Sequence, residues 1–202
     1  MYMKQFNKQL INETASILKS GGLIAFPTET VFGFGVVFDN ENSYKRLIDV
    51  KRRPPEKPFT LMCADVEDVE KYALTDDRSQ KLIKRFMPGQ FTIILDAKDV
   101  LPSYCVSKEN KVGIRIPNDE FVRDLIRKTG KPLLVPSANK SGEPPINNSD
   151  EIVRQFENEI DGVIIGEANS KVPSTIVLVD KDIQVIREGL ITKEEIFKAL
   201  EE

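Results

Sequence analysis

The sequence predicts an α/β fold, with one domain over residues 1–202 built on a single twisted, mixed and largely open sheet with flanking helices. Three observations lead to this prediction. Short apolar runs alternate with amphipathic segments along the first two thirds of the chain, which is typical of strands alternating with helices. Several apolar runs then cluster late in the chain, which favours a mixed sheet. No internal repeat or break in composition marks a second domain.

The chain is organised around residues 22–35. The apolar run 23–26 lies between Gly-Gly and Pro27, and it predicts a short buried strand that the proline ends, because proline lacks the backbone donor needed for pairing. Gly33 and Gly35 are interpreted as turn positions or as room for a close-lying ligand.

The other elements follow from periodicity, capping residues and breakers. Apolar residues at helical spacing between N-cap candidates and Gly or Pro predict helices over 7–20, 43–51, 66–72, 75–87, 118–130, 149–156 and 193–200. Asn7, Thr75, Asn118 and Ser149 are the expected N-caps, and Thr192 with Glu195 forms a capping box. Apolar runs predict strands over 59–64, 91–95, 112–116, 133–135, 162–165, 174–179 and 183–186, and 98–111 is expected to be a loop.

Composition narrows the chemistry. The chain has 40% hydrophobic residues, a net charge of −3 and no histidine. The missing imidazole excludes Ser-His-Asp and Cys-His catalysis, and the net charge argues against strong general binding of nucleic acid. Cys63 and Cys105 match no zinc or redox spacing, no metal-ligating cluster is expected, and no apolar run approaches the ~20 residues of a membrane span. We expect a soluble cytoplasmic protein.

Three polar corners share one pattern, in which proline and hydroxyl side chains adjoin a buried strand. They are Thr30 after Pro27, Ser137 and Asn139 after Pro136, and Ser174 after Pro173. Ligands of α/β sheets bind at strand ends, so we expect these side chains to meet in one cleft. The alternative at each corner is simple turn chemistry.

A basic segment follows the second predicted helix. Arg53 precedes a proline, which biases it to an extended conformation, and in an extended chain Lys51 and Arg53 point to the same side. Together with Lys57 these cations suit a polyphosphate. The alternative is a solvated basic loop, but the stiff prolines around the cations favour the phosphate site.

Two further arginines are candidates. Arg115 lies inside an apolar strand, where a buried guanidinium needs a carboxylate partner. The partner is either a protein Asp or Glu or a ligand carboxylate. Arg187 follows a strand and is either a phosphate ligand or a surface residue. Neither a P-loop nor a complete G-x-G-x-x-G pattern is present, so side chains would hold any nucleotide.

Six motifs in order resemble the YrdC-like family of threonylcarbamoyl-AMP synthases. They are Thr-Glu-Thr-Val-Phe-Gly after Phe26-Pro27, Lys51-x-Arg53 with Pro58, Gly-Ile-Arg115-Ile-Pro117, Ser137-Ala-Asn139-x-Ser-Gly142, Pro173-Ser174-Thr175-Ile-Val and Arg187-Glu-Gly189. The resemblance covers residues 8–190 and the length is that of the single-domain members. It implies a YrdC/RibB-like α/β sheet around a concave basic cavity.

The resemblance also implies an activity. Such enzymes, which are nucleotidyltransferases, form threonylcarbamoyl-adenylate and pyrophosphate from L-threonine, bicarbonate or CO2, and ATP, with Mg²⁺ held mainly by the ATP phosphates. A separate tRNA threonylcarbamoyl transferase complex then modifies adenosine 37 of tRNAs.

Residue roles carried over by resemblance divide into three groups. The threonine site would comprise Thr30, Met62, Arg115, Val135 and Ser174, with main-chain contacts near Met62 and Val135. The ATP site would comprise Arg53, Lys57, Lys111, Ser137, Pro145 and Arg187. The catalytic signatures would be Lys51 with Arg53 and Ser137 with Asn139.

One departure and two alternatives remain open. Met62 stands where relatives often have a histidine, which is harmless if the main chain makes the contact. One rival function is a tRNA-binding or double-stranded-RNA-binding module without synthase activity. The other is a carbamoyl-transferring relative for enzyme maturation, but such proteins are longer and have zinc-finger-like cysteines.

Overall fold

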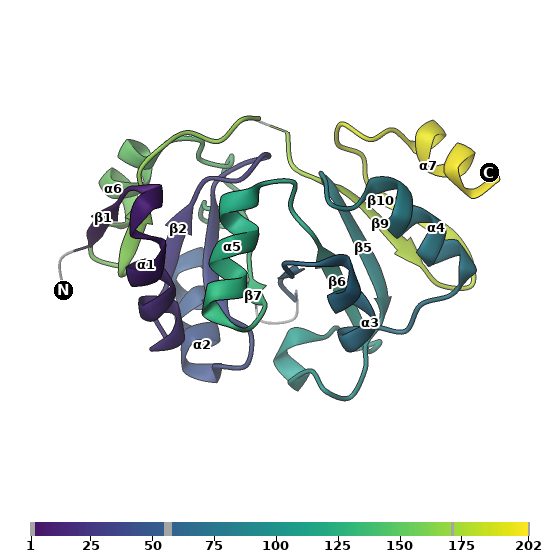
Figure 1. Ribbon diagram of the computed structural model, residues 1–202, viewed down its shortest axis with the longest axis horizontal. Helices are drawn as coiled ribbons and strands as arrows, with labels where there is room; N and C mark the ends of the chain where they lie inside the picture. The colour runs from purple at the N-terminus through teal and green to yellow at the C-terminus, as the bar shows by residue number, and fades with distance from the viewer. Residues whose placement is uncertain (1–2, 55–57, 171, 202) are drawn as a thin grey trace.

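The structure, a computed structural model, describes residues 3–54, 58–170 and 172–201 (Figure 1). The strands of these residues form one ten-stranded sheet in the order β1-β8-β2-β3-β7-β4-β6-β5-β9-β10. Its strands are β1 Lys4–Phe6, β2 Ile24–Phe26, β3 Gly33–Val37, β4 Leu61–Met62, β5 Phe91–Asp96, β6 Lys111–Arg115, β7 Leu133–Leu134, β8 Gly162–Ile164, β9 Thr175–Val179 and β10 Ile183–Arg187. The pairs β1–β8, β2–β8, β4–β6 and β5–β9 are parallel, and the others are antiparallel. The predicted open mixed sheet is confirmed.

Helices cover both faces of the half of the sheet that contains β2 and β7. In Figure 1, α1 and α5 lie in front of this half and α2 and α6 behind it, while α4 and α7 lie beside β5, β9 and β10. The helices are α1 Ile11–Lys19, α2 Glu41–Lys51, α3 Val69–Tyr72, α4 Asp77–Phe86, α5 Glu120–Thr129, α6 Ser149–Phe156 and α7 Lys193–Glu201, with 3-10 turns at Lys8–Leu10, Val66–Asp68 and Ser103–Cys105. Among the described helices, none has the length and apolar composition to span a membrane.

The predicted strand and helix positions differ from the structure in a few places. The segment with Gly33 and Gly35 is a strand rather than turns: β3 pairs antiparallel with β2, and a Cβ at Gly35 would lie 2.5 Å from Phe26. Glycine at this position therefore serves close packing against Phe26. The strand β1 was not predicted, and β4 is shorter than predicted.

The predicted N-caps are mostly displaced by one residue. Asn7 caps the 3-10 turn that leads into α1. The other three predictions are wrong, because a neighbouring residue bonds the helix instead: Asp76, Asp119 and Asn148 accept from backbone amides three residues on. The capping box at Thr192 and Glu195 is confirmed by hydrogen bonds in both directions.

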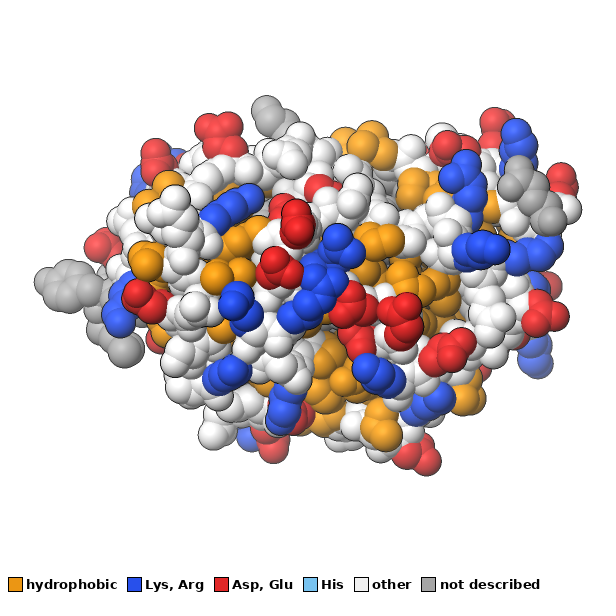
Figure 2. All heavy atoms as spheres, viewed as in Figure 1, with side chains coloured by type: hydrophobic (Ala, Val, Ile, Leu, Met, Phe, Trp, Pro, Cys, Tyr) orange, Lys and Arg blue, Asp and Glu red, His pale blue; other side chains and the backbone are white. Residues whose placement is uncertain are grey.

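The surface seen in Figure 2 carries interspersed acidic and basic side chains, with apolar side chains exposed between them. No broad field of one sign covers this face, as the net charge of −3 predicts.

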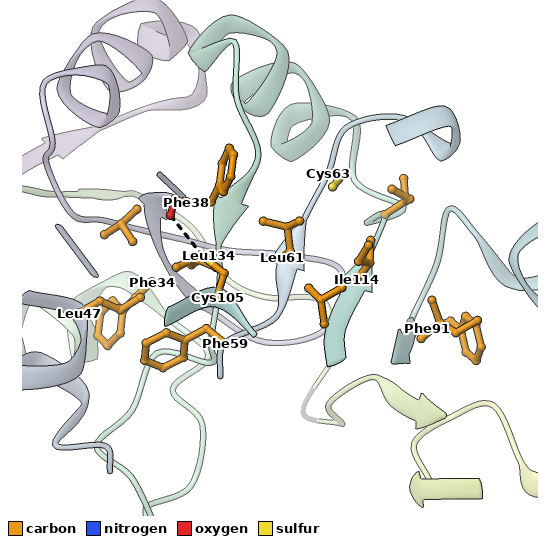
Figure 3. Packing of buried hydrophobic residues seen from close by; sticks show 14 of the residues in the cluster. Phe34, Phe38, Leu47, Phe59, Leu61, Cys63, Phe91, Cys105, Ile114 and Leu134 are labelled. Carbon is orange, nitrogen blue, oxygen red and sulfur yellow. Dashed lines mark hydrogen bonds between the residues drawn. The ribbon is translucent and has the colours of Figure 1, made fainter. Parts of the chain in front are cut away.

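The core is built from aromatic and aliphatic side chains of both halves of the sheet. Figure 3 shows Phe34, Leu61, Phe91 and Ile114 among them. Cys105 donates to the carbonyl of Phe38 at 3.4 Å. Both cysteines are free and buried, and burial raises the pKa of the Cys105 thiol to about 12. These thiols are packing residues.

Side chains alternate between the two faces of β5, β6 and β9. One face packs in the core, and the opposite face is available for the site. Phe91, Ile93 and Leu95 of β5 belong to the core, as do Val112 and Ile114 of β6. The intervening residues line a hollow instead: Thr92 and Ile94 of β5, Lys111, Gly113 and Arg115 of β6, and Ile176 and Leu178 of β9. The two-residue period of a strand therefore puts Lys111 and Arg115 on one surface.

Candidate functional site

A cavity of about 160 Å³ lies where the predicted polar corners meet. It is lined by residues that follow β2 and β7, precede β4 and β9, and project from β4, β5, β6 and β10. Eight predicted site residues line it: Thr30, Arg53, Met62, Arg115, Val135, Ser137, Ser174 and Arg187. The hypothesis that the hydroxyls of Thr30, Ser137 and Ser174 converge on one cleft is confirmed.

Two hydroxyls of the cavity are held by neighbouring hydroxyls. Thr30 Oγ1 lies 2.8 Å from Thr28 Oγ1, which in turn donates to the carbonyl of Val31. Ser174 Oγ lies 2.8 Å from Thr92 Oγ1. All four threonine and serine side chains are buried, so these hydrogen bonds satisfy them and fix the positions of the two cavity hydroxyls.

The cavity is basic. Its described lining includes three arginines, Arg53, Arg115 and Arg187, and no carboxylate. Arg187 Nε and Nη2 donate to the carbonyl of Ser174 at 3.0 and 2.7 Å. Burial, and secondly the nearby Arg115, lowers the pKa of Arg187. Two guanidinium groups that repel each other across a hollow favour an anion between them.

Arg53 lies at the mouth of the cavity. Its guanidinium stacks over the ring of Phe59 at 5.0 Å and donates to the carbonyl of Pro58 at 3.2 Å. Burial lowers its pKa. These contacts hold the group at the cavity, where the basic segment was predicted to bind phosphate.

Arg115 has the internal partner that was one of the two predicted alternatives. Its Nη2 lies 2.8 Å from Glu29 Oε1, and both side chains are buried. The ion pair does not remove Arg115 from the site, because the residue also lines the cavity. Glu29 was not among the predicted site residues, although it is the central residue of the Thr-Glu-Thr motif.

The predicted geometry of the basic segment is wrong. Lys51 is the last residue of α2, and Arg52 ends the helix in the left-handed conformation at φ 48°. The segment from Lys51 to Arg53 is therefore not an extended chain. Lys51 is only 2% exposed and lies behind the cavity wall. Two cations therefore do not project side by side; Arg53 lines the cavity and Lys51 supports it.

Lys51 is bound to the Ser137 segment. Its Nζ donates to the carbonyl of Ser137 at 2.6 Å and to Asn139 Oδ1 at 3.3 Å. Ser137 Oγ donates to the same Oδ1 at 2.6 Å, and Asn139 Nδ2 donates to the carbonyls of Lys140 and Glu143. Burial, and secondly Arg53, lowers the pKa of Lys51 to about 8. Lys51 of the first predicted signature and Ser137 with Asn139 of the second thus form one network that fixes the Ser137 hydroxyl.

The remaining predicted residues are not all in the cavity. Lys111 lines a groove of about 580 Å³ that shares Arg53, Phe59 and Thr92 with the cavity. Its Nζ pairs with Asp96 and Asp180 at 2.8 and 3.1 Å. Pro145 lines a different groove, with residues 143–148, and is not brought to the cavity. Lys57 lies outside the described residues.

Thr92 is a second residue that sequence reasoning missed. It lies on the border of the cavity and the groove and bonds Ser174. The signal in the sequence was a hydroxyl inside the apolar run 91–95 at a position that alternates with core residues.

Gly189 gives a prediction about the Ser174 turn. A Cβ at this position would lie 2.4 Å from the carbonyl oxygen of Pro173 and 3.1 Å from the carbonyl carbon of Ser174, both backbone atoms that cannot rotate away. We expect Gly189→Ala to lower the free energy of unfolding by about 1–3 kcal/mol and to weaken ligand binding at Ser174. Thermal unfolding and ligand titration measure the two effects. Gly113→Ala is the control for stability, because its Cβ would meet Thr92 at an ordinary 3.6 Å, and an equal loss of stability in both variants would contradict the prediction.

A family model matches most of the chain. The model of the Sua5/YciO/YrdC family, described as telomere recombination, matches residues 16–189, which include every cavity residue discussed above. The chain belongs to the Sua5/YciO/YrdC family. The predicted family membership is therefore confirmed.

Other members of the Sua5/YciO/YrdC family agree with this fold. The threonylcarbamoyl-AMP synthase of Bacillus subtilis (strain 168) is 34% identical over 94% of this chain and 56% of its own length. The crystal structure of P. abyssi Sua5 complexed with L-threonine matches with a TM-score of 0.90 and 31% identity, over 98% of this chain and 60% of that one. E. coli YciO matches with a TM-score of 0.85 and 27% identity, over 94% of this chain and 95% of that one. The chain spans about half the length of the B. subtilis relative.

Proposed function

We propose that this protein is a threonylcarbamoyl-AMP synthase, which forms threonylcarbamoyl-adenylate and pyrophosphate from L-threonine, bicarbonate or CO2, and ATP. The observation that carries the proposal is the union of a small cavity lined by three arginines with a larger adjoining groove. The cavity has the scale of an amino acid, and the groove of about 580 Å³ falls in the usual range of about 300–1,000 Å³ for larger ligands. The B. subtilis synthase and the threonine-bound P. abyssi structure support it.

The amino acid occupies the cavity. The guanidinium of Arg115 binds its carboxylate, because a planar fork of donors matches a carboxylate. The hydroxyls of Thr30 and Ser174 orient the rest of the molecule, and backbone groups near Met62 and Val135 complete the wall. Main-chain contacts at Met62 do not need an imidazole, so the departure from the histidine of relatives is compatible with binding.

The nucleotide enters from the groove with its phosphates towards the cavity. Arg53 and Arg187 line the cavity and carry the charge that the phosphates need, with the Ser137 hydroxyl, held by Asn139, as a fixed donor. Lys111 lies farther along the groove. Its ammonium group pairs with Asp96 and Asp180, so a phosphate that binds Lys111 competes with these two carboxylates. Lys57 is retained as a predicted ATP residue, and Pro145 is not assigned to the site.

The reaction needs no histidine. The neutral amine of threonine attacks CO2, forming an N–C bond and a carbamate as the nitrogen loses a proton. A carbamate oxygen then attacks the α-phosphorus, and the bond to the bridging oxygen of the β-phosphate breaks so that pyrophosphate leaves. The arginines neutralise the phosphate charge and hold the reactants together, which are the main contributions a protein makes to such a transfer.

Magnesium is part of the nucleotide substrate in this scheme. The described cavity lining offers guanidinium and hydroxyl groups but no carboxylates, which does not fit a dedicated protein site for a hard cation. Phosphate oxygens are the fitting ligands, so we expect Mg²⁺ to bind with ATP.

The product is an activated acyl-adenylate that a second enzyme must consume. We propose that a tRNA threonylcarbamoyl transferase complex accepts it for adenosine 37 of tRNAs, in the cytoplasm. The free, buried cysteines support a reducing compartment.

The test is pyrophosphate release from MgATP with bicarbonate, measured with and without L-threonine. We expect release to depend on both L-threonine and bicarbonate. L-serine and L-valine are the comparison substrates. L-serine lacks the methyl group of threonine, and L-valine lacks its hydroxyl group. Pyrophosphate release that is independent of threonine would contradict the proposed synthase activity and favour the RNA-binding alternative.

A further inference from the structure

The guanidinium of Arg115 is held by the protein along one edge. Nε donates to the carbonyl of Gly89 at 3.3 Å, and Nη2 donates to Glu29 Oε1 at 2.8 Å. In the part of the chain that the structure describes, no acceptor binds Nη1, although the residue lines the cavity. Because Nε and Nη2 form one edge of the planar fork, the edge that carries Nη1 is left for a ligand.

Glu29 is itself held in place. Its Oε1 also accepts from the backbone N–H of Asn118 at 2.9 Å, and its carbonyl accepts from Gln90 Nε2 at 3.3 Å. The residue is 8% exposed and does not line the cavity. Oε2 is buried and has no hydrogen-bond partner among the described residues. Glu29 Oε1 therefore joins Arg115 to Asn118, which lies in the segment before α5.

Repulsion from Arg187 makes the hydrogen bond to Glu29 Oε1 necessary for the orientation of Arg115. Arg187 lines the same cavity and is close enough to Arg115 that the two guanidinium groups repel each other. Among the described residues, Glu29 is the carboxylate that pairs with Arg115, and Arg187 has no ion-pair partner. Without the Glu29 contact, repulsion would turn Arg115 away from Arg187 and out of line with a bound anion.

We propose that Glu29 is a positioning residue for substrate recognition. It fixes Arg115 so that the Nη1 edge faces the cavity, and it thereby makes binding selective for an amino acid with a free carboxylate. This proposal rests on the proposed function, because it takes the amino acid to be the ligand of Arg115.

Three variants separate reach from charge. Glu29→Ala removes the acceptor, and Glu29→Asp shortens its reach by one methylene while keeping the charge. Glu29→Gln keeps an oxygen at the Oε1 position for Arg115 and Asn118, with its amide nitrogen at the position of unpartnered Oε2. The neutral amide does not compensate the positive charge of Arg115, which therefore remains available to a ligand carboxylate, so this variant is expected to retain binding.

The readout is the affinity of the full chain for L-threonine compared with L-threoninamide, which lacks the carboxylate. We expect Glu29→Ala and Glu29→Asp to weaken L-threonine binding by about 10- to 100-fold, as for loss of a charge-assisted contact, and to change L-threoninamide binding by less than about threefold. The KM for ATP and the kcat at saturating threonine should stay within about twofold, because the lost interaction is one of ground-state binding.

Asp161→Asn is the matched control. Asp161 also holds an arginine, Arg46, and a backbone N–H, that of Leu23, but it lies outside the cavity. It is expected to lower thermal stability without changing the ratio of the two ligand affinities.

The outcomes are distinguishable. If Glu29→Ala weakens both ligands equally, as a general loss of structure would, the positioning role is overturned. Glu29→Gln as impaired as Glu29→Ala would also overturn it, because the acceptor is kept. If the wild-type protein binds no L-threonine, the proposed function fails and this inference with it. Unchanged selectivity of Glu29→Ala and Glu29→Asp, in a protein that binds L-threonine, overturns the inference alone.

Discussion

Replacing Arg115 with alanine is expected to raise the KM for L-threonine by at least about 100-fold, while the KM for ATP changes much less. The guanidinium lines the cavity, and its Nη1 has no acceptor among the described residues. Arg187 does not replace it, because two of its nitrogens donate to the carbonyl of Ser174. Steady-state pyrophosphate release at varied threonine and varied ATP measures the two constants.

The same substitution is expected to lower stability. Arg115→Ala leaves the buried carboxylate of Glu29 without its partner, and breaking a buried pair on one side costs about 3–5 kcal/mol. Arg115→Lys keeps the charge but loses the planar fork, so it should be more stable yet still poor in threonine binding.

Arg46→Ala is the control for loss of an arginine–carboxylate pair, since Arg46 binds Asp161 away from the cavity. A larger effect of Arg115→Ala on ATP than on threonine would show that the amino-acid and nucleotide sites are exchanged.

Replacing Lys51 with methionine is expected to impair nucleotide use more than threonine use. The substitution removes the donor that binds the carbonyl of Ser137 and Asn139 Oδ1, so the Ser137 hydroxyl is no longer fixed at the cavity wall. Loss of a hydrogen bond from a charged group, about 1.5–3 kcal/mol, corresponds to an increase in the KM for ATP of about 10- to 100-fold.

Lys51 also predicts a pH dependence of stability. Its pKa is lowered to about 8 by burial, whereas the unfolded chain has the ordinary value of 10.5. Between these values the unfolded state binds more protons than the folded state, so the contribution of Lys51 to stability rises with pH in that window. Denaturant unfolding should therefore show wild type gaining up to about 3 kcal/mol relative to Lys51→Met between about pH 7.5 and about pH 10.5.

Lys81→Met is the matched control for Lys51→Met. Lys81 also donates to a carbonyl, that of Leu200, but on the surface, so it should show neither the pH-dependent difference nor the effect on ATP. A stability difference between wild type and Lys51→Met that is flat with pH would contradict the burial of a protonated amine.

Prediction from the sequence succeeded where a short stretch of the chain is enough to define a strand or its end. Apolar runs ended by proline placed the strand ends, and the hydroxyls beside them were expected to converge because strands of one sheet share an edge. It failed at β3, where Gly33 and Gly35 resemble turn residues and only the neighbouring Phe26 and Val135 explain why no side chain fits.

The predicted geometry of the basic segment, residues 51–53, was wrong for a different reason. Pro54 favours an extended Arg53, but Lys51 belongs to the last turn of α2, where the predicted helix 43–51 also ends, and Leu47 and Val50 of this helix pack in the core. Tertiary packing therefore decided that Lys51 is a buried support and Arg53 a cavity residue.

The amino-acid sequence alone determined the α/β class, the order of most elements, the family and half of the residues that line the cavity, because these depend on apolar periodicity, strand breakers and motifs read along the chain. Only the tertiary structure decided the partners: Glu29 for Arg115, Thr92 for Ser174, and Ser137 with Asn139 for Lys51. Partner choice depends on which strands lie side by side, and residues 86 positions apart have no periodicity that could indicate their contact.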